Sequence, residues 1–140
     1  MPRGPIPEAF HDLLESTAFA FVSTLGAKGE PHVNPVWFLW NSSHIQISLM
    51  PGTQKYLNLM RDPRISVAIA HPANPYRYLE VRGRIGPTEH DTNDAVFNAI
   101  STKYTGGVFS LEEARTNRFV GTVEVERYTF QDSQGIPSAT

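Results

Sequence analysis

A hydroxyl and a cation stand at the expected start of a short helix near the middle of the chain. Pro51 and Gly52 interrupt the residues before it, Thr53 is a suitable N-cap, and Lys55 falls in the first turn. Free N–H groups and the positive end of the helix dipole meet at a helix N-terminus, so an anion can bind there. The pattern predicts a phosphate site in outline. A capped helix with a solvated lysine explains the same residues without a ligand.

Arginines gather in the segment that follows. Its charged residues are Lys55, Arg61, Arg64, Arg77, Arg82 and Arg84 against Asp62 and Glu80, a local charge of +4 over residues 55–84 in a chain of net charge −2. Arginine forks suit phosphate and carboxylate groups. In the strand expected over residues 76–85, Glu80, Arg82 and Arg84 share one face. Either ligand contact or an Arg–Glu ladder at a subunit interface explains these arginines.

Aromatic side chains could wall a pocket for a planar ring, because aromatic faces stack on conjugated systems. The candidates are Trp37, Phe38, Trp40, Tyr76 and Tyr78. Packing in the core explains most of them equally well.

Several classes of function lack support in the sequence. The net charge of −2 provides no long-range field for nucleic acid or an anionic membrane, and the absence of cysteine removes disulfides and thiolate chemistry. The five histidines, at 11, 32, 44, 71 and 90, include no pair at a metal-binding helical spacing, so we expect no metal site. No side chain is assigned as catalytic. Without a signal peptide or an apolar run of membrane length, we expect a cytoplasmic protein with no membrane partner.

The elements expected from periodicity and breakers are mostly strands joined by short connections. We expect helices over 7–16, 53–61, 90–104 and 111–115, and strands over 19–25, 32–40, 45–49, 65–70, 76–85 and 118–130. Length and an apolar content of 40% fit a single domain over residues 1–140, with loose ends at 1–6 and 133–140. The fold class is mainly β, an antiparallel barrel of six or seven strands with short peripheral helices.

Three segments of the chain together resemble a known family. They run from Gly29 to Phe38, from Gly52 to Arg64 and from Asn74 to Gly83, in family order. The chain resembles the pyridoxamine-phosphate-oxidase-like split-barrel superfamily, and within it the reductases thought to use the deazaflavin coenzyme F420. The resemblance spans about residues 18–130 and implies an FMN-binding-like split β-barrel.

The resemblance also implies a cofactor site at the junction of two subunits in a homodimer. It places the cofactor's phosphate near Thr53, Gln54 and Lys55, with Asn58 one turn on. The ring and ribityl chain would lie beside Ser48, Leu49, Met50 and the segment from His32 through Pro35 and Val36 to Trp37. Tyr78, Arg82 and Arg84 become candidates for contact across the subunit junction.

The function implied is that of an F420-dependent oxidoreductase, which passes a hydride between reduced F420 and a small conjugated acceptor. FMN is the alternative cofactor, in an oxidoreductase of the pyridoxamine-phosphate-oxidase type. A non-catalytic barrel that binds a flavin, heme or another tetrapyrrole is the alternative from a different class.

Overall fold

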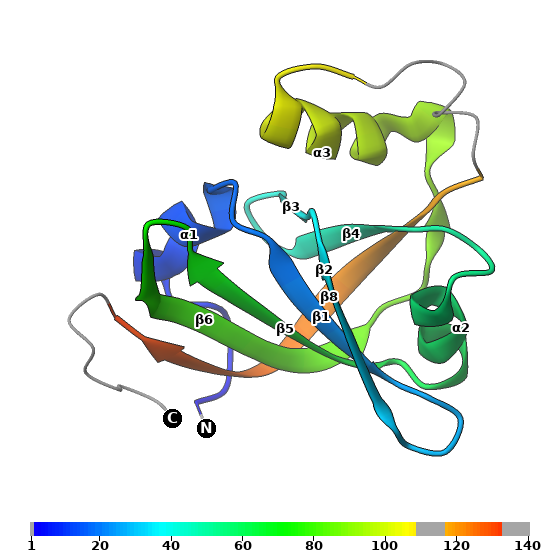
Figure 1. Cartoon of the computed structure of the whole chain (residues 1–140), viewed down its shortest axis with the longest axis horizontal. Helices are drawn as coiled ribbons and strands as arrows, with labels where there is room; N and C mark the ends of the chain where they lie inside the picture. The colour runs from blue at the N-terminus through cyan, green and yellow to red at the C-terminus, as the bar shows by residue number, and fades with distance from the viewer. Residues whose placement is uncertain (1, 109–116, 133–140) are drawn as a thin grey trace.

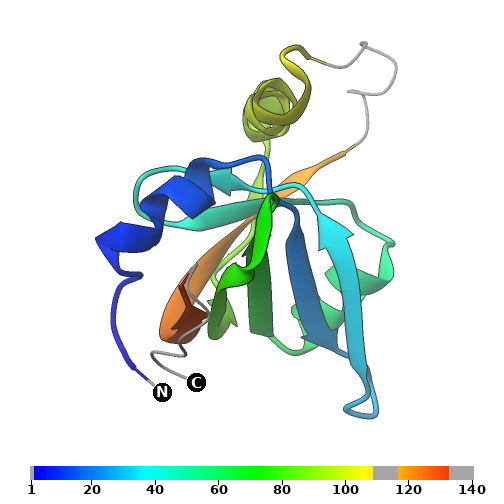
Figure 2. The same ribbon diagram turned by 60° about the vertical axis from the view of Figure 1, so that its left-hand side comes forward.

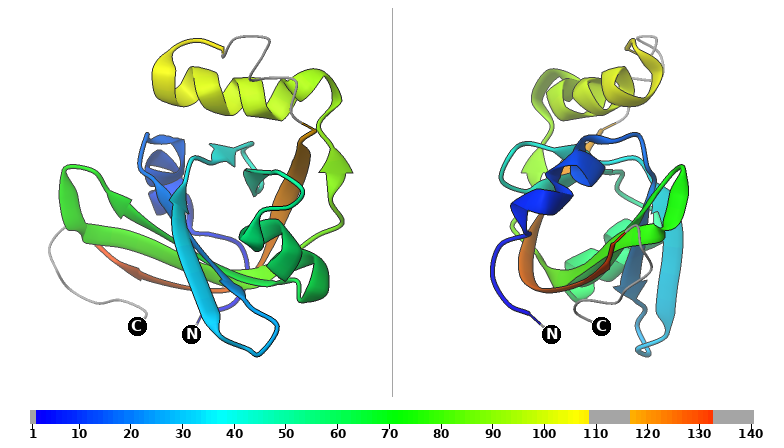
Figure 3. Two further views of the ribbon diagram at one scale, coloured as in Figure 1. Left: turned by 45° about the vertical axis from the view of Figure 1, so that its right-hand side comes forward. Right: turned by 90° about the vertical axis from the view of Figure 1, so that its left-hand side faces the viewer.

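A single curled antiparallel sheet dominates the computed structural model, which describes residues 2–108 and 117–132. Within those residues the sheet has eight strands: seven follow the order β2-β1-β5-β6-β8-β4-β3, and β7 pairs with β8 beside this path. The strands are β1 Ala20–Leu25, β2 Pro31–Val36, β3 Leu39–Trp40, β4 Ile45–Leu49, β5 Arg64–His71, β6 Asn74–Ile85, β7 Glu89–His90 and β8 Phe119–Gln131. Figures 1 and 3 show the sheet curling into a half-barrel, which confirms the predicted split-barrel fold.

Apolar side chains at alternate positions along the strands fill the inside of the curled sheet. Ile45, Ile47 and Leu49 of β4 are fully buried, and the polar residues between them face the other way. A 3₁₀ turn over Glu8–Phe10 and the helix α1, His11–Glu15, add Phe10, Leu13 and Leu14 to the same core, as the amphipathic pattern of residues 7–16 predicts.

The run expected as one strand over 32–40 is divided into β2 and β3 around Trp37 and Phe38. Phe38 turns into the core, where none of it is exposed, so the chain leaves the ladder at this point. Pro35 lies in β2 at the end of the sheet path, where a missing N–H costs least. The two-residue strands β3 and β7 raise the strand number above the six or seven expected.

Helix α3, Ala95–Thr105, overlaps the helix expected over 90–104, starts five residues later and ends one residue beyond it. The buried carboxylate of Asp91 accepts hydrogen bonds from the amides of Val96 and Phe97, both at 2.9 Å, and so caps the helix. Figures 1 and 2 show α3 at one end of the molecule, away from the helix α2, Gln54–Arg61. The helix expected over 111–115 and the end at 133–140 lie outside the described residues.

Residues 2–6 are not the loose end that the sequence predicts. The Pro2 carbonyl accepts a hydrogen bond from the Tyr128 amide at 3.2 Å, and Arg3 forms an isolated antiparallel bridge with Arg127. Ile6 is buried in the core. Pairing with β8 and the burial of Ile6 therefore hold this segment in place.

None of the helices in the described part of the chain has the length and apolar character that a membrane span requires.

Candidate functional site

The N-terminus of α2 is capped as the sequence predicts. Thr53 accepts a hydrogen bond at Oγ1 from the Tyr56 amide at 3.4 Å and donates one to the Met50 carbonyl at 2.8 Å. The first amides of a helix have no intrahelical acceptor, so those of Gln54 and Lys55 remain available to an anion.

Lys55 is a half-buried cation in the first turn of α2. Its ammonium group has no hydrogen-bond or ion-pair partner among residues 2–108 and 117–132. Loss of hydration lowers the pKa of Lys55, because burial disfavours the charged form. A bound anion would supply the missing counter-charge. This is the strongest local indication of a phosphate site.

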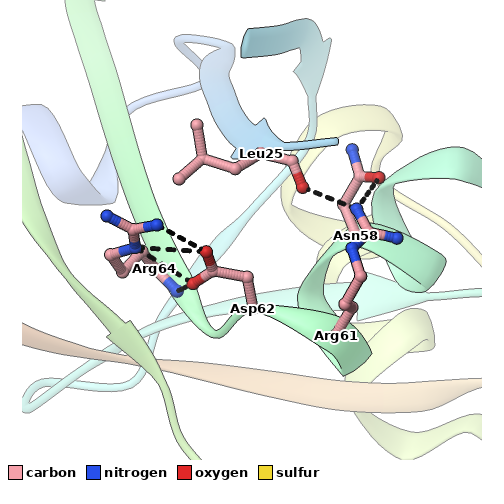
Figure 4. A network of polar contacts seen from close by, with 5 residues as sticks. All are labelled: Leu25, Asn58, Arg61, Asp62 and Arg64. Atoms are coloured by element: carbon pink, nitrogen blue, oxygen red, sulfur yellow. Dashed lines mark hydrogen bonds and ion pairs between the residues drawn. The ribbon is translucent and has the colours of Figure 1, made fainter. Parts of the chain in front are cut away.

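The side chains of Gln54 and Asn58, both in α2, already form hydrogen bonds within the chain. Asn58 is fully buried and donates through Nδ2 to the Thr24 hydroxyl at 3.0 Å. Its Oδ1 accepts from Gln54 Nε2 at 2.7 Å and from Arg61 Nη2 at 3.1 Å, and Arg61 also donates to the Leu25 carbonyl (Figure 4). These contacts fix α2 on β1, so the observed role of Asn58 is to support the helix that carries Lys55.

The inner face of β2 carries polar groups without partners. His32, Asn34 and Val36 alternate onto the face that pairs with buried residues of β1. His32 Nδ1 and Asn34 Oδ1 are buried and have no hydrogen-bond partner in the described part of the chain. Unpaired buried polar atoms cost stability, and a ligand that bonds to them would offset that cost. Pro35 lies on the other face, opposite Phe21.

Ser48 and Met50 contribute partly buried groups at the end of β4. The Ser48 hydroxyl accepts a hydrogen bond from Arg118 Nη1 at 3.3 Å. The Arg118 guanidinium also lies 3.7 Å from the centre of the Phe97 ring, and desolvation lowers its pKa. Leu49 is fully buried in the core. Only the backbone of Leu49 therefore remains for a ligand, while the Met50 carbonyl is already used by the α2 cap.

Trp37 is held by a residue that the sequence interpretation does not identify. The Trp37 and Tyr104 rings stack at 5.0 Å with an angle of 6° between their planes. The Tyr104 hydroxyl donates to the Ala18 carbonyl at 2.6 Å and accepts from the Phe38 amide at 3.4 Å. Burial raises the pKa of Tyr104 to about 12. Tyr104 therefore fixes the orientation of Trp37.

Lys103 of α3 contacts the segment between β2 and β3, next to Trp37. Its ammonium group donates to the carbonyls of Leu14 and Phe38, at 3.2 and 3.1 Å, and lies 3.7 Å from the centre of the Phe38 ring. Burial lowers the pKa of Lys103 to about 8. A lysine next to a tyrosine in the last turn of an otherwise uncharged helix is the sequence signal for this anchor.

The five candidate aromatics do not wall one pocket. Phe38 lies in the core, the Trp40 ring lies 5.1 Å from the His11 ring in a tilted arrangement, and Tyr76 is 67% exposed. Trp37 alone combines a partly buried ring with a position next to the inner face of β2.

Tyr78 lies apart from the residues around α2 in a single chain. It pairs with Ala70 of β5, whereas Ser23, next to Thr24, pairs with Ser66. Four residues of strand separate these positions, or about 13 Å. Tyr78 also lies on the outer face of the sheet, between inward positions such as Leu79.

Arg82 and Arg84 lie on the outer face of β6, while Leu79, Val81 and Ile85 are buried, as the alternation predicts. Arg82 forms an ion pair with Glu80 at 3.0 Å, and Arg84 contacts Glu126 at 3.6 Å. The Arg–Glu pairs considered from the sequence therefore occur within one chain.

The described part of the chain contains cavities of about 330 and 530 Å³, and none of the predicted cofactor residues lines either of them. Lys55, His32 and Ser48 therefore lie outside the lining of both cavities.

Comparisons with known proteins agree with this architecture. A family model described as pyridoxamine 5'-phosphate oxidase matches residues 6–132. A solved structure described as an F420 reductase is 28% identical, with a TM-score of 0.80, and the match covers 88% of this chain and 98% of that one. Comparison with curated proteins gave no match.

Two further solved structures share the fold at lower identity. A conserved hypothetical protein from Mycobacterium tuberculosis is 22% identical, with a TM-score of 0.71 and coverage of 96% of this chain and 91% of that one. A heme binding protein from Mycobacterium smegmatis is 21% identical, with a TM-score of 0.67 and coverage of 96% and 58%.

Proposed function

Because the chain belongs to the pyridoxamine 5'-phosphate oxidase family, we propose that it is an oxidoreductase whose flavin-type cofactor binds between α2, β2 and β4. The observation that carries this proposal is Lys55, a half-buried ammonium without a partner among the described residues, beside the capped start of α2. Its charge and the free amides of the first turn suit the phosphate of such a cofactor.

Coenzyme F420 is the first choice of cofactor and FMN the second. The preference for F420 is supported by the likeness to the F420 reductase structure. Either cofactor would supply the hydride chemistry, with a small conjugated molecule as acceptor in the case of F420.

The chain's own residues would bind and orient the cofactor. Lys55 and the α2 amides would hold the phosphate, and His32 and Asn34 would gain hydrogen-bond partners. The stacked Trp37 would flank the ring from a fixed orientation, because Tyr104 holds it. No side chain is assigned the transfer of a proton.

We further propose that two copies pair through the outer face of β1 and β2. Phe19, Phe21 and Val33 on this face are 50%, 45% and 62% exposed, and Pro35 lies opposite Phe21. Contiguous exposed apolar side chains are typical of an interface. Pairing would allow Tyr78 of one copy to reach the cofactor of the other, which it cannot do within its own chain.

The cofactor is tested by titrating the purified protein with F420, FMN and hemin in parallel, following tryptophan fluorescence. Saturable binding of F420 in preference to FMN, followed by oxidation of reduced F420 with a conjugated acceptor, supports the proposal. Preference for FMN would indicate an FMN-dependent oxidoreductase in place of an F420-dependent one. Tight binding of hemin with no turnover on either flavin would overturn the oxidoreductase.

The homodimer is tested by analytical ultracentrifugation of the wild type and of Phe21→Asp. A buried charge at the centre of the apolar face should weaken the dimer at least about tenfold and weaken cofactor binding with it. Val108→Asp, at a residue that is 65% exposed after α3, is the matched control and should change neither. A monomeric wild type that binds cofactor at full strength would contradict the pairing.

A further inference from the structure

The outer face of the sheet carries a second concentration of positive charge, separate from Lys55. A cavity of about 330 Å³ spans β1, β5, β6 and β8 on this face. Its lining includes Arg64, Arg82, Arg84 and Arg127, together with Ser23 and Ser66, and we call it the arginine groove. Glu126 is the one acidic residue in the lining.

The arginines of the groove stand directly opposite one another on neighbouring strands. Arg64 of β5 pairs in register with Arg84 of β6, and Arg82 of β6 pairs with Arg127 of β8. Register partners in an antiparallel sheet project from the same face, and like charges in such pairs are destabilising. Two such pairs side by side carry a cost that a bound anion would offset.

Neighbouring carboxylates neutralise this charge only in part. Arg64, Arg82 and Arg84 each contact one carboxylate, yet their side chains remain 63%, 57% and 58% exposed. Arg127 is half-buried, and its guanidinium has no hydrogen-bond or ion-pair partner among residues 2–108 and 117–132. Each guanidinium has five N–H donors, so many donors of the groove stay available.

The local backbone sets this arrangement. The register between β6 and β8 shifts at Arg82 and Gly83, which marks a β-bulge. A Cβ atom at Gly83 would collide with the Glu124 carbonyl, so glycine allows the two strands to approach here. The bulge leaves Glu126 beside Arg84 while Arg82 faces Arg127.

We propose that the arginine groove is a binding site for a small multivalent oxyanion, a di- or tricarboxylate or a phosphate, distinct from the phosphate site at Lys55. Guanidinium forks bind carboxylate and phosphate oxygens in pairs, and the Ser23 and Ser66 hydroxyls add neutral donors. The cavity volume lies at the lower end of the range for small-molecule sites. The site does not depend on the nature of the cofactor.

The test uses citrate and inorganic phosphate as probes, with chloride at equal ionic strength as the reference. Titration followed by amide NMR should give saturable shifts at Ser23, Ser66 and Gly83. Replacing both Arg82 and Arg127 by Gln should weaken citrate binding at least about tenfold. Lys28→Gln removes an exposed charge from the turn between β1 and β2 and should change the affinity by less than about twofold.

Three further results separate this site from the others. Lys55→Gln should leave citrate binding unchanged, whereas Arg127→Gln alone should leave cofactor binding unchanged. At low salt without citrate, the double variant should be at least as stable as the wild type, because repulsion between paired arginines is removed. The proposal is overturned if the amide NMR shifts are confined to α2, or if Lys28→Gln loses as much citrate affinity as the double variant. It is also overturned if the wild type binds no citrate and the double variant differs from it only in the loss of the dimer.

Discussion

The cation at the start of α2 differs in exposure and in pairing from three of the four arginines of the outer groove. Lys55 is half-buried and has no carboxylate among the described residues, whereas Arg64, Arg82 and Arg84 are largely exposed and each contacts one. Burial makes a single unpaired charge costly, while solvent reduces the value of an exposed ion pair. One lysine can therefore matter more for ligand binding than an arginine that already has a carboxylate partner.

The same contrast appears between the last turn of α2 and the start of β5. Figure 4 shows Arg61 and Asn58 in a network that reaches Leu25, and Asp62 in a separate contact with Arg64. Asn58 is fully buried, while the Arg64 side chain is 63% exposed. The buried network should contribute to stability and the exposed pair should not.

The largest effect is expected for Asn58→Ala. It leaves the Thr24 hydroxyl and the Gln54 amide without their buried partner, which should lower the free energy of unfolding by about 2–3 kcal/mol. Asn34→Ala is the matched control, because the buried Oδ1 of Asn34 has no partner to lose. Urea unfolding of both variants measures the difference, and equal losses would remove the distinction between the two asparagines.

Lys103 should make stability depend on pH. Its pKa falls from 10.5 to about 8 in the folded chain, so the unfolded chain holds more protons between these values. Stability should therefore rise with pH across that window, by about 1–2 kcal/mol after allowance for partial exposure. Urea unfolding of the wild type and of Lys103→Met across this window isolates the contribution. A parallel pH profile in the two proteins would contradict it.

The smallest effect is expected for Asp62→Asn. The exposed Arg64 lowers the pKa of Asp62 to about 2, so the ion pair persists at neutral pH and is lost only as the pH falls through that value. Exposed pairs contribute little, and the thermal midpoint at neutral pH should not change measurably. Citrate affinity should rise slightly, because Arg64 is released. A clear loss of stability in Asp62→Asn would contradict the distinction between this ion pair and the buried network around Asn58.

Local patterning predicts most of the fold. The strict alternation of Ile45, Ile47 and Leu49 and the cap at Thr53 need only neighbouring residues, and the structure contains both as expected. The break at Trp37 and Phe38 is different, because it depends on α3 residues more than sixty positions further along the chain. The docking of residues 2–6 depends in the same way on a distant strand.

The candidate site is predictable only in part, for the same reason. A helix cap beside a lysine is a local pattern, so Thr53 and Lys55 are found from the sequence. Tyr104 and Arg118 are not, because stacking on Trp37 and bonding to Ser48 arise from pairing between distant segments. Likewise, the opposed arginines of the groove can be recognised only once the register of β5, β6 and β8 is known.

The most direct test of the cofactor site is titration of F420 into the wild type, Lys55→Gln and Lys28→Gln over a range of pH. Loss of the charge–phosphate contact in Lys55→Gln should weaken binding about tenfold, with Lys28→Gln unchanged. Because burial lowers the pKa of Lys55, its ammonium group loses its proton before the pH reaches 10.5. Wild-type affinity should therefore fall as the pH rises toward 10.5, and Lys55→Gln should lack that fall. Equal affinities and parallel pH profiles in all three proteins would contradict a phosphate site at Lys55.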